Sequence, residues 1–590
     1  MKLTVAQAII KCLEKEEIDV CFGLTGSHLL ALFNALKDSK IKYYSVKHEC
    51  AAGFMALNYT KVSQKPALIV ATAGPGAANL INSVAELYKC QIPAIIITPI
   101  VSTLSFGKIA FQEDSGYGTS YSVIKVMSCV TKHSLLAINA QMIPAYIREL
   151  FRFALMPPYG PVHLGVPVNL FTEEIEIEDI SPSQYRFIND ERIEYNKIKK
   201  VLEYIKNSQK PVLLIGNRCI YPDCSDALIN LIDKFNLPFI LTHASKGILD
   251  ETHKMFGGIL DYFGHRSAEK FAKESDLIIS FGMDFSESET IKYDKELFKN
   301  AKIISFDNCE LFIGVNYPVE MAIIGSLPLS INTLINFLDK ANYKSNYIPE
   351  KFNEDFKIIN KHQIEEANKQ TNPMTIYFLF NEISELLEDS VVFMDQSAIG
   401  CSSVRYFVAK QRNYFTSPTG YSIAQSVSGV VGGKIALPQK QVFCITGDGA
   451  FLMHGAEVLT AVQYNLGITW IIFKEDYYNM IQINQSLAYG GSLEFCAKIK
   501  NPDYKFLAQA YYCDYYEVNT LQDLQNAIKD AKENNLKNKC TLIIINYDYE
   551  QHLPIKPQLV QTMKDLGQTK DIKSNPYLMK AFSKALKEKV

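Results

Sequence analysis

Residues 441–476 read QVFCITGDGAFLMHGAEVLTAVQYNLGITWIIFKED, and this stretch indicates the fold of the chain. It predicts a strand, a Gly-Asp-Gly turn at residues 447–449, a helix over about 450–464, and a second strand that ends near Phe473. In such a βαβ unit both strand ends open on the same carboxyl edge of a parallel sheet, where α/β proteins bind ligands.

The Gly-Asp-Gly turn combines a permissive backbone with a carboxylate. Glycines allow a tight turn and close approach of a ligand, and the N-terminus of the following helix favours an anion. A carboxylate beside phosphate oxygens suits Mg²⁺. Asp448 is therefore a candidate metal ligand, and Glu475, two residues past the second strand, is another oxygen donor. Taken alone, the motif is equally compatible with a plain turn.

The alternation of apolar strands and helices continues along the whole chain. Apolar runs such as 65–73 (KPALIVATA) and 276–282 (DLIISFG) are separated by helical stretches. This pattern predicts parallel sheets that are covered on both faces. The polar stretches 181–197 and 341–372 interrupt it and are interpreted as connectors. The predicted domains are 1–180, 195–340 and 372–548, followed by a tail at 549–590.

The composition excludes several classes of protein. The chain has 590 residues, of which 48% are hydrophobic and 21% charged, as is typical of a folded protein. A net charge of −3 provides no general attraction for nucleic acid or an anionic membrane. The longest apolar run, near 92–101, is too short to span a bilayer. Thirteen scattered cysteines without a CxxC pair indicate reduced thiols, so we expect a cytoplasmic protein.

The N-terminus is predicted to be part of the folded structure. Thr4 and Gln7 have the spacing of a capping box, and apolar residues follow at helical intervals. Acidic residues come next, where a signal peptide would need small ones.

Two upstream segments carry further candidate residues. Glu49 lies at a strand-to-helix junction in VKHECAAGFMALNYTKV, and residues 74–76 place Gly-Pro-Gly between a strand and a helix. The dense glycines suit a phosphate or cofactor edge. The alternative for Glu49 is a first-turn acid that the helix dipole favours. No Walker A motif is present, because the segment around Lys434 lacks the required spacing, and no GxGxxG follows a strand.

Taken together, these segments resemble the thiamine-diphosphate-dependent enzymes of the acetolactate synthase (acetohydroxyacid synthase) catalytic-subunit family. Further matches run in family order, including 21–36 (CFGLTGSHLLALFNAL), 107–114 (GKIAFQED), 160–167 (GPVHLGVP) and 479–491 (NMIQINQSLAYGG). The resemblance extends from about residue 4 to 548. It implies an α/β protein with three doubly wound parallel-sheet domains, which would be pyrimidine-binding, central and diphosphate-binding.

The resemblance also implies roles for individual residues. A glutamate at the position of Glu49 hydrogen-bonds the aminopyrimidine ring and relays the proton that creates the nucleophile. Gln112 and Lys132 match residues near the substrate entrance, although Lys132 has a solvated surface role as its alternative. The implied cofactor-binding positions are Gly74, Pro75, Gly76, Ile423, Gly447, Asp448, Gly449, Ala450 and Met480, with core packing as the alternative for Ile423 and Met480. The implied metal positions are Asp448, Glu475 and Tyr477.

The chain departs from the family at the metal motif. The family ends this motif with two asparagines, the second of which is a neutral Mg²⁺ ligand, whereas this chain has Lys474 and Glu475. Glu475 adds a negative charge beside the diphosphate, which Lys474 could partly offset. We expect metal binding to be retuned, with its loss as the alternative.

The central domain departs from the family as well. FAD-binding members carry an arginine soon after a strand end, where this chain has Asp284, and the segment around Asp307 keeps only part of the acidic ribose motif. These residues disfavour FAD but leave it open. The chain also lacks the His-His pair with which pyruvate decarboxylases handle protons, which favours carboligation over simple decarboxylation.

The resulting prediction is decarboxylation of a pyruvate-like 2-oxoacid with thiamine diphosphate and Mg²⁺, followed by carboligation. One alternative is an oxalyl-CoA or 2-hydroxyacyl-CoA lyase type of enzyme, and another is an impaired paralogue that acts as a binding or regulatory subunit. Family members place the cofactor between subunits, so a homodimer or homotetramer is expected, with Glu49 from one subunit and Asp448 from the other. A regulatory subunit is left open. The lysine-rich tail is interpreted as a packed helix, with a lid or a docking segment as alternatives.

Overall fold

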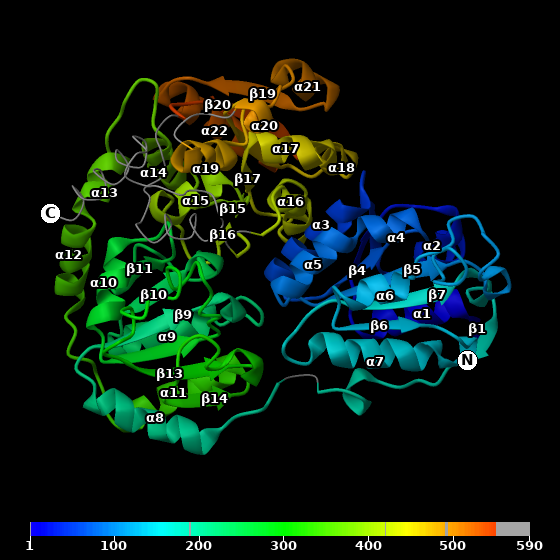
Figure 1. Cartoon of the computed structure of the whole chain (residues 1–590), viewed down its shortest axis with the longest axis horizontal. Helices are drawn as coiled ribbons and strands as arrows, with labels where there is room; N and C mark the ends of the chain where they lie inside the picture. The colour runs from blue at the N-terminus through cyan, green and yellow to red at the C-terminus, as the bar shows by residue number, and fades with distance from the viewer. Residues whose placement is uncertain (1, 188–189, 419–420, 490–493, 550–590) are drawn as a thin grey trace. The chain divides into compact units, whose positions relative to one another are not determined.

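The computed structural model describes residues 2–187, 190–418, 421–489 and 494–549 (Figure 1). Three six-stranded parallel sheets, with helices between their strands, form its framework. This architecture confirms the predicted α/β fold class. No helix within the described residues has the length and apolar character needed to cross a membrane.

The first sheet has the strand order β3-β2-β4-β5-β7-β6. Its strands are β2 (Val20–Gly23), β3 (Lys42–Ser45), β4 (Ala67–Val70), β5 (Ala94–Ile100), β6 (His133–Leu136) and β7 (Val162–Pro167). The helix α1 (Val5–Lys15) precedes these strands, and the helices between them are α2 (Leu30–Lys37), α3 (Glu49–Ser63), α4 (Pro75–Asn79), α5 (Ile81–Lys89), α6 (Val123–Ser128) and α7 (Ile143–Leu155). In addition, β1 (Lys2–Thr4) and β8 (Glu174–Glu176) pair as a short antiparallel ribbon. The predicted capping box is confirmed, because Thr4 Oγ1 accepts the N–H of Gln7 and the Gln7 side chain accepts the N–H of Thr4.

The middle sheet has the order β11-β10-β9-β12-β13-β14. Its strands are β9 (Pro211–Ile215), β10 (Phe239–Thr242), β11 (Phe256–Leu260), β12 (Leu277–Phe281), β13 (Lys302–Asp307) and β14 (Met321–Ile324). Four longer helices lie around it in Figure 1, α8 (Tyr195–Asn207), α9 (Ser225–Phe235), α10 (Arg266–Glu274) and α11 (Leu327–Lys340). The strand order reverses between β9 and β12, which makes the space above these two strands a topological switch point.

The third sheet has the order β16-β15-β17-β18-β20-β19, the same connectivity as the first. Its strands are β15 (Val391–Met394), β16 (Tyr414–Phe415), β17 (Val442–Gly447), β18 (Thr469–Lys474), β19 (Asp514–Val518) and β20 (Thr541–Asn546). Helices of this part are α14 (Ile376–Leu386), α15 (Ala398–Tyr406), α19 (Asn479–Tyr489), α20 (Glu494–Ala497), α21 (Tyr504–Ala510) and α22 (Leu521–Leu536). The polar connector predicted at 341–372 contains α12 (Pro349–Ile359) and α13 (Lys361–Ala367).

The helix predicted over about 450–464 is interrupted. The chain forms α17 (Asp448–His454), a 3₁₀ turn η9 (Gly455–Glu457) and α18 (Val458–Gln463). Glycine has low helix propensity, so Gly455 allows the break. The break also lets the Glu457 side chain reach main-chain groups near α3.

By packing, the described residues form two compact units. The first unit contains the described residues of 1–190 together with 425–439 and 454–466, and the second contains the rest. Within the first unit, α16 (Gln425–Ala436) packs directly on α3. Glycines permit this contact: a Cβ on Gly432 would lie 2.0 Å from the Met55 carbonyl oxygen, and one on Gly429 2.3 Å from Asn58 Nδ2. Apart from Tyr549, the predicted tail lies outside the described residues.

Candidate functional site

Glu49 is the first residue of α3, immediately after the turn that leaves β3. This turn is held by the buried carboxylate of Glu457, whose Oε1 accepts the N–H groups of Lys47 at 2.9 Å and His48 at 3.0 Å. Its other oxygen accepts from Thr460 Oγ1 at 2.6 Å. Burial raises the pKa of Glu457, although these hydrogen bonds lower it. Glu457 therefore fixes the backbone that presents Glu49.

The carboxylate of Glu49 is buried, with 7% of the residue exposed. Its Oε2 accepts a hydrogen bond from Asn79 Nδ2 at 3.0 Å. Its Oε1 faces Gly76, where an added Cβ would lie 3.2 Å away. The side chain is thus oriented through one oxygen, while the absence of a side chain at Gly76 leaves space beside the other.

The Gly74–Pro75–Gly76 turn lies next to Gln112. Gly74 has a φ of +64°, and an added Cβ would lie 2.9 Å from the carbonyl oxygen of Gln112. Its N–H donates to Asp114 Oδ2 at 2.9 Å, which ties the turn to the 107–114 segment. Pro75 opens α4. The structure therefore brings the predicted residues at 74–76 together with both Glu49 and Gln112.

His28 also belongs to this cluster, although it was not among the residues predicted from the sequence. It follows β2, and its Nδ1 lies 2.9 Å from Gln112 Oε1, while its ring stacks on Phe111 at 6.1 Å between centroids. The sequence did contain one indication of this role, because His28 follows a strand within a segment that resembles the family. Its contact with Gln112 spans 84 positions, which local patterns do not reveal.

Lys132 has a different environment. Its Nζ donates to the carbonyl oxygens of Phe153 and, at 2.5 Å, Met156 at the C-terminal end of α7. A cation at this position stabilises the helix terminus. These contacts involve neither Glu49 nor Gln112, and a substrate role for Lys132 stays a prediction.

A second cluster lies in the other unit, at the carboxyl end of β17. The carboxylate of Asp448 is fully buried. Its Oδ1 accepts from the Gly449 N–H at 2.8 Å, and its Oδ2 accepts from the N–H groups of Glu475 at 2.9 Å and Asp476 at 2.7 Å. Asn501 Nδ2 adds a fourth donor at 2.6 Å. Burial raises the pKa of Asp448, although its four donors lower it.

The other residues of the Gly-Asp-Gly turn adjoin Asp448. An added Cβ on Gly449 would lie 2.8 Å from the ring of Tyr478, so any other residue there would have to displace this ring. Gly447 ends β17, and Ala450 is buried in the first turn of α17. This arrangement gathers the predicted residues 447–450 at one point of the sheet edge.

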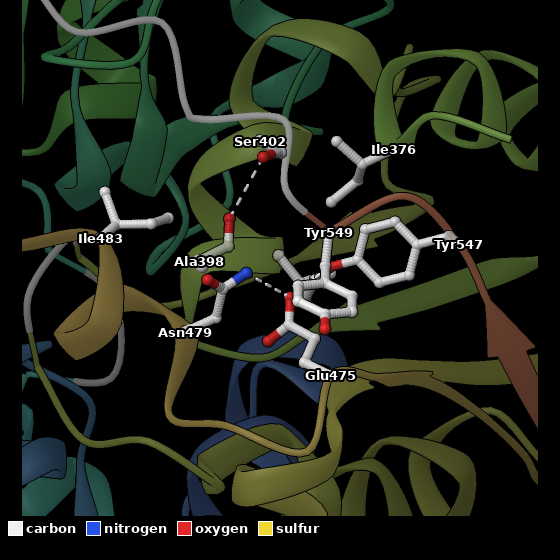
Figure 2. A pocket seen from close by; sticks show the side chains of 9 residues that line it. Ile376, Ala398, Ser402, Glu475, Asn479, Ile483, Tyr547 and Tyr549 are labelled. Atoms are coloured by element: carbon white, nitrogen blue, oxygen red, sulfur yellow. Dashed lines mark hydrogen bonds between the residues drawn. The ribbon is translucent and has the colours of Figure 1, made fainter. Parts of the chain in front are cut away.

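The carboxylate of Glu475 points into a small pocket beside this turn (Figure 2). Its Oε1 accepts from Asn479 Nδ2 at 2.7 Å and from the Tyr547 hydroxyl. Burial raises the pKa of Glu475 to about 8, with Tyr547 and Asn479 lowering it and Asp448 raising it. The remaining lining residues come from α14, α15, α19 and the segment after β20, and are Ile376, Ala398, Ile399, Ser402, Ile483 and Tyr549.

These side chains fit a Mg²⁺ ion in part. Mg²⁺ commonly binds one or two protein carboxylates and completes its shell with phosphate oxygens and water. Asp448 suits this pattern, whereas Glu475 would first have to leave Tyr547 and Asn479. Tyr477 follows two positions later in the same loop. Within the described part of the chain, no three His, Cys, Asp or Glu residues converge as a metal cluster.

Ile423 and Met480 lie in the second unit. Ile423 is 39% exposed, next to Ala424, whose N–H donates to Asp395 Oδ2 at 2.9 Å. Asp395 is buried after the end of β15 and organises this loop, another contact that the sequence pattern did not indicate. Met480 is half-buried and packs against the hydrophobic core that surrounds the middle sheet. The cofactor-shaping roles of both residues stay predictions.

Comparison with known protein families matches three parts of the chain to three domains of one family of enzymes. Residues 3–118 match the thiamine pyrophosphate enzyme N-terminal TPP binding domain, 198–334 the central domain, and 398–545 the C-terminal TPP binding domain. These matches include Glu49 and residues 74–76 in the first model and Asp448 and Glu475 in the third.

Curated relatives agree with these domains. The chain is 28% identical to the probable acetolactate synthase large subunit of Methanococcus aeolicus over 546 residues, 89% of each chain. It is 27% identical to that of Methanocaldococcus jannaschii, covering 94% of this chain and 93% of the relative. It is 26% identical to the acetolactate synthase large subunit of Haemophilus influenzae, covering 94% and 96%. The chain therefore belongs to the thiamine pyrophosphate-dependent enzymes and resembles those of the acetolactate synthase type.

Proposed function

We propose that the protein decarboxylates a pyruvate-like 2-oxoacid, using thiamine diphosphate and Mg²⁺, and joins the resulting fragment to a second carbonyl compound. The observation that carries the proposal is Glu49, a buried carboxylate that is held through one oxygen and open at the other. The acetolactate synthase relatives support the carboligation step.

In this proposal, the residues of the first unit bind the substrate and transfer protons. When bound, thiamine diphosphate supplies the nucleophilic carbon and the electron sink for decarboxylation. Glu49 Oε1 would hold or release a proton toward the bound cofactor, while Asn79 fixes the orientation of the carboxylate. Gln112 would hydrogen-bond the reacting acid, with its amide group held by His28 at 2.9 Å.

In this proposal, the second unit supplies the residues that bind the diphosphate of the cofactor. Asp448 would hold Mg²⁺ together with diphosphate oxygens, and the start of α17 favours the anion. The carboxylate of Glu475 is already engaged by Tyr547 and Asn479. Asp448 is therefore the principal protein ligand of the metal in this proposal.

The proposal includes an assembly of at least two chains. Glu49 and Asp448 belong to separate compact units. A cofactor shared by two copies would receive Glu49 from one and Asp448 from the other, which favours a homodimer or a homotetramer. The thirteen cysteines all lie within the described residues and form no disulfide there, in keeping with a reducing cytoplasm.

The proposal is tested in two steps with the full chain. Calorimetric titration of thiamine diphosphate into stripped protein should give saturable binding with Mg²⁺ and much weaker binding with EDTA. Pyruvate should then yield acetolactate. Cofactor binding with turnover of CoA esters, but no acetolactate, would instead indicate the lyase alternative. Absence of cofactor binding under both conditions would point to the impaired paralogue.

A further inference from the structure

The switch point of the middle sheet is closed by the chain itself. In doubly wound sheets, ligands bind outside the carboxyl ends of the strands at such a point. Here the turns leaving β9 and β12 touch, because a Cβ on Gly216 would lie 2.3 Å from the carbonyl oxygen of Gly282. Gly282, with a φ of +56°, also lies against Arg218, whose Cβ would be 2.8 Å from an added Cβ. The glycines thus bring two turns together instead of opening a crevice.

The guanidinium of Arg218 fills the space between these turns. Its side chain is 1% exposed. Nε donates to Asp307 Oδ1 at 2.9 Å, and Nη2 donates to Asp307 Oδ2 at 2.6 Å and to the Met283 carbonyl oxygen at 2.8 Å. Nη1 pairs with Asp284, and the Phe312 ring covers the guanidinium at 4.1 Å. All three nitrogens are therefore committed to the protein.

The side chains that contact the Arg218 guanidinium are acidic or apolar. Asp284 and Asp307 both pair with the one guanidinium, so its charge is already matched by two carboxylates. Glu289 is buried nearby and accepts from the Ser286 N–H at 3.0 Å. Two buried amides, Asn217 and Asn308, have no hydrogen-bond partner among the described residues, but they carry no charge. A pyrophosphate, with about two negative charges, would find no uncommitted cation in this group.

The residues present do not fit FAD. Asp284 presents a negative charge beside Arg218, where a nucleotide pyrophosphate would need a positive one. Asp307, the acid at the end of β13, is held by Arg218 along both of its oxygens and is not available to a ribose. Admitting a nucleotide would require breaking a buried ion pair and leaving its charges unpaired, which is strongly unfavourable.

We infer that Arg218 closes the carboxyl edge of the middle domain as an internal counter-ion, so that the domain takes neither FAD nor another ligand that presents an ADP pyrophosphate. This inference does not rest on the proposed function, because its measurement is nucleotide binding and not turnover. It bears on that function by disfavouring a CoA-ester lyase that would bind its nucleotide here.

The test uses the purified full chain. Flavin released on denaturation is measured by absorbance, and FAD, ADP and CoA are titrated at millimolar concentration while Tm is followed. A ligand at about 100 times its Kd raises Tm by several degrees, whereas we expect shifts below about 0.5 °C and no stoichiometric flavin. Stoichiometric flavin, or a saturable shift with ADP that Asp307→Asn abolishes, would overturn the inference.

A pair of variants tests the closure itself. Arg218→Met should lower Tm by more than about 5 °C because it leaves the buried Asp307 and the half-buried Asp284 without their partner. Arg192→Met is the matched control, since Arg192 is an exposed arginine of the same domain. An Arg218→Met protein as stable as this control would contradict the role of Arg218.

Discussion

In the proposed mechanism, the neighbours of Glu49 prepare it for proton transfer by acting on different parts of the residue. Glu457 holds the backbone before it, Asn79 holds one carboxylate oxygen, and Gly76 leaves space at the other. Glu49→Gln keeps the shape and the contact with Asn79 but removes the proton-relay group. We expect kcat to fall by about 10²–10⁴-fold with thiamine diphosphate binding retained in calorimetry. The exposed Glu173→Gln serves as a control, and an unchanged rate for Glu49→Gln would remove the relay role.

His28 and Gln112 should act as one unit. Their side chains share a hydrogen bond of 2.9 Å, so either substitution to alanine removes the same interaction. Kinetics of the two single variants and the double variant should give a coupling energy of about 0.5–1.5 kcal/mol in kcat/KM. Strictly additive effects would show that His28 does not act through Gln112.

His163 provides a residue-scale test of pH dependence. Its ring is buried between Thr98 Oγ1 and Ser134 Oγ, each at 2.8 Å, and burial lowers its pKa to about 3. Below about pH 6.5 the unfolded chain gains a proton that the folded state refuses, so stability is present above this pH and is lost as the pH falls toward 3. The contribution is about 1.4 kcal/mol per pH unit in that range. In unfolding measurements at pH 7.5 and 5, His163→Gln should reduce the acid loss by about 2 kcal/mol, whereas the exposed His362→Gln should not.

At the scale of elements, the packing of α16 on α3 connects a helix that is remote in sequence to the helix that carries Glu49, the proposed proton relay. Because an added Cβ at Gly432 would lie 2.0 Å from the Met55 carbonyl oxygen, Gly432→Ala must push the helices apart. We expect a loss of about 1–3 kcal/mol in unfolding free energy, together with reduced activity, since α3 carries Glu49. Ser428→Ala on the same helix removes a buried hydroxyl without a partner among the described residues and should be tolerated. Equal behaviour of the two variants would contradict this account of the interface.

The sequence patterns predicted the elements better than their long-range contacts. Apolar runs and strand-to-helix glycines placed the three sheets, Glu49 and Asp448, because those signals are local. The break at η9 was missed because it depends on Glu457 bonding to the main chain of Lys47 and His48, about 410 positions away in sequence. The same limit applies to Arg218, whose partner Asp307 is 89 positions distant. The orientation of the Glu475 carboxylate toward Tyr547 likewise depends on tertiary packing, so local patterns could not predict it.

At the scale of the whole molecule, sharing of the site between chains can be measured by mixing two inactive variants. A chain with Glu49→Gln keeps Asp448, and a chain with Asp448→Asn keeps Glu49. If each site takes Glu49 from one copy and Asp448 from another, a mixed dimer contains one site with both native residues and one with neither. Random exchange forms mixed dimers in about half of cases, so the mixture should recover about a quarter of the native activity per chain.

The controls for this experiment separate assembly from chemistry. Each variant alone, taken through the same exchange procedure, should remain inactive, and mixing without exchange should recover nothing. Native chains treated in parallel give the yield of reassembly against which recovery is scaled. Absence of recovery with efficient exchange would place both residues of each site in a single chain. Recovery near the expected fraction would instead support a dimer as the smallest active form.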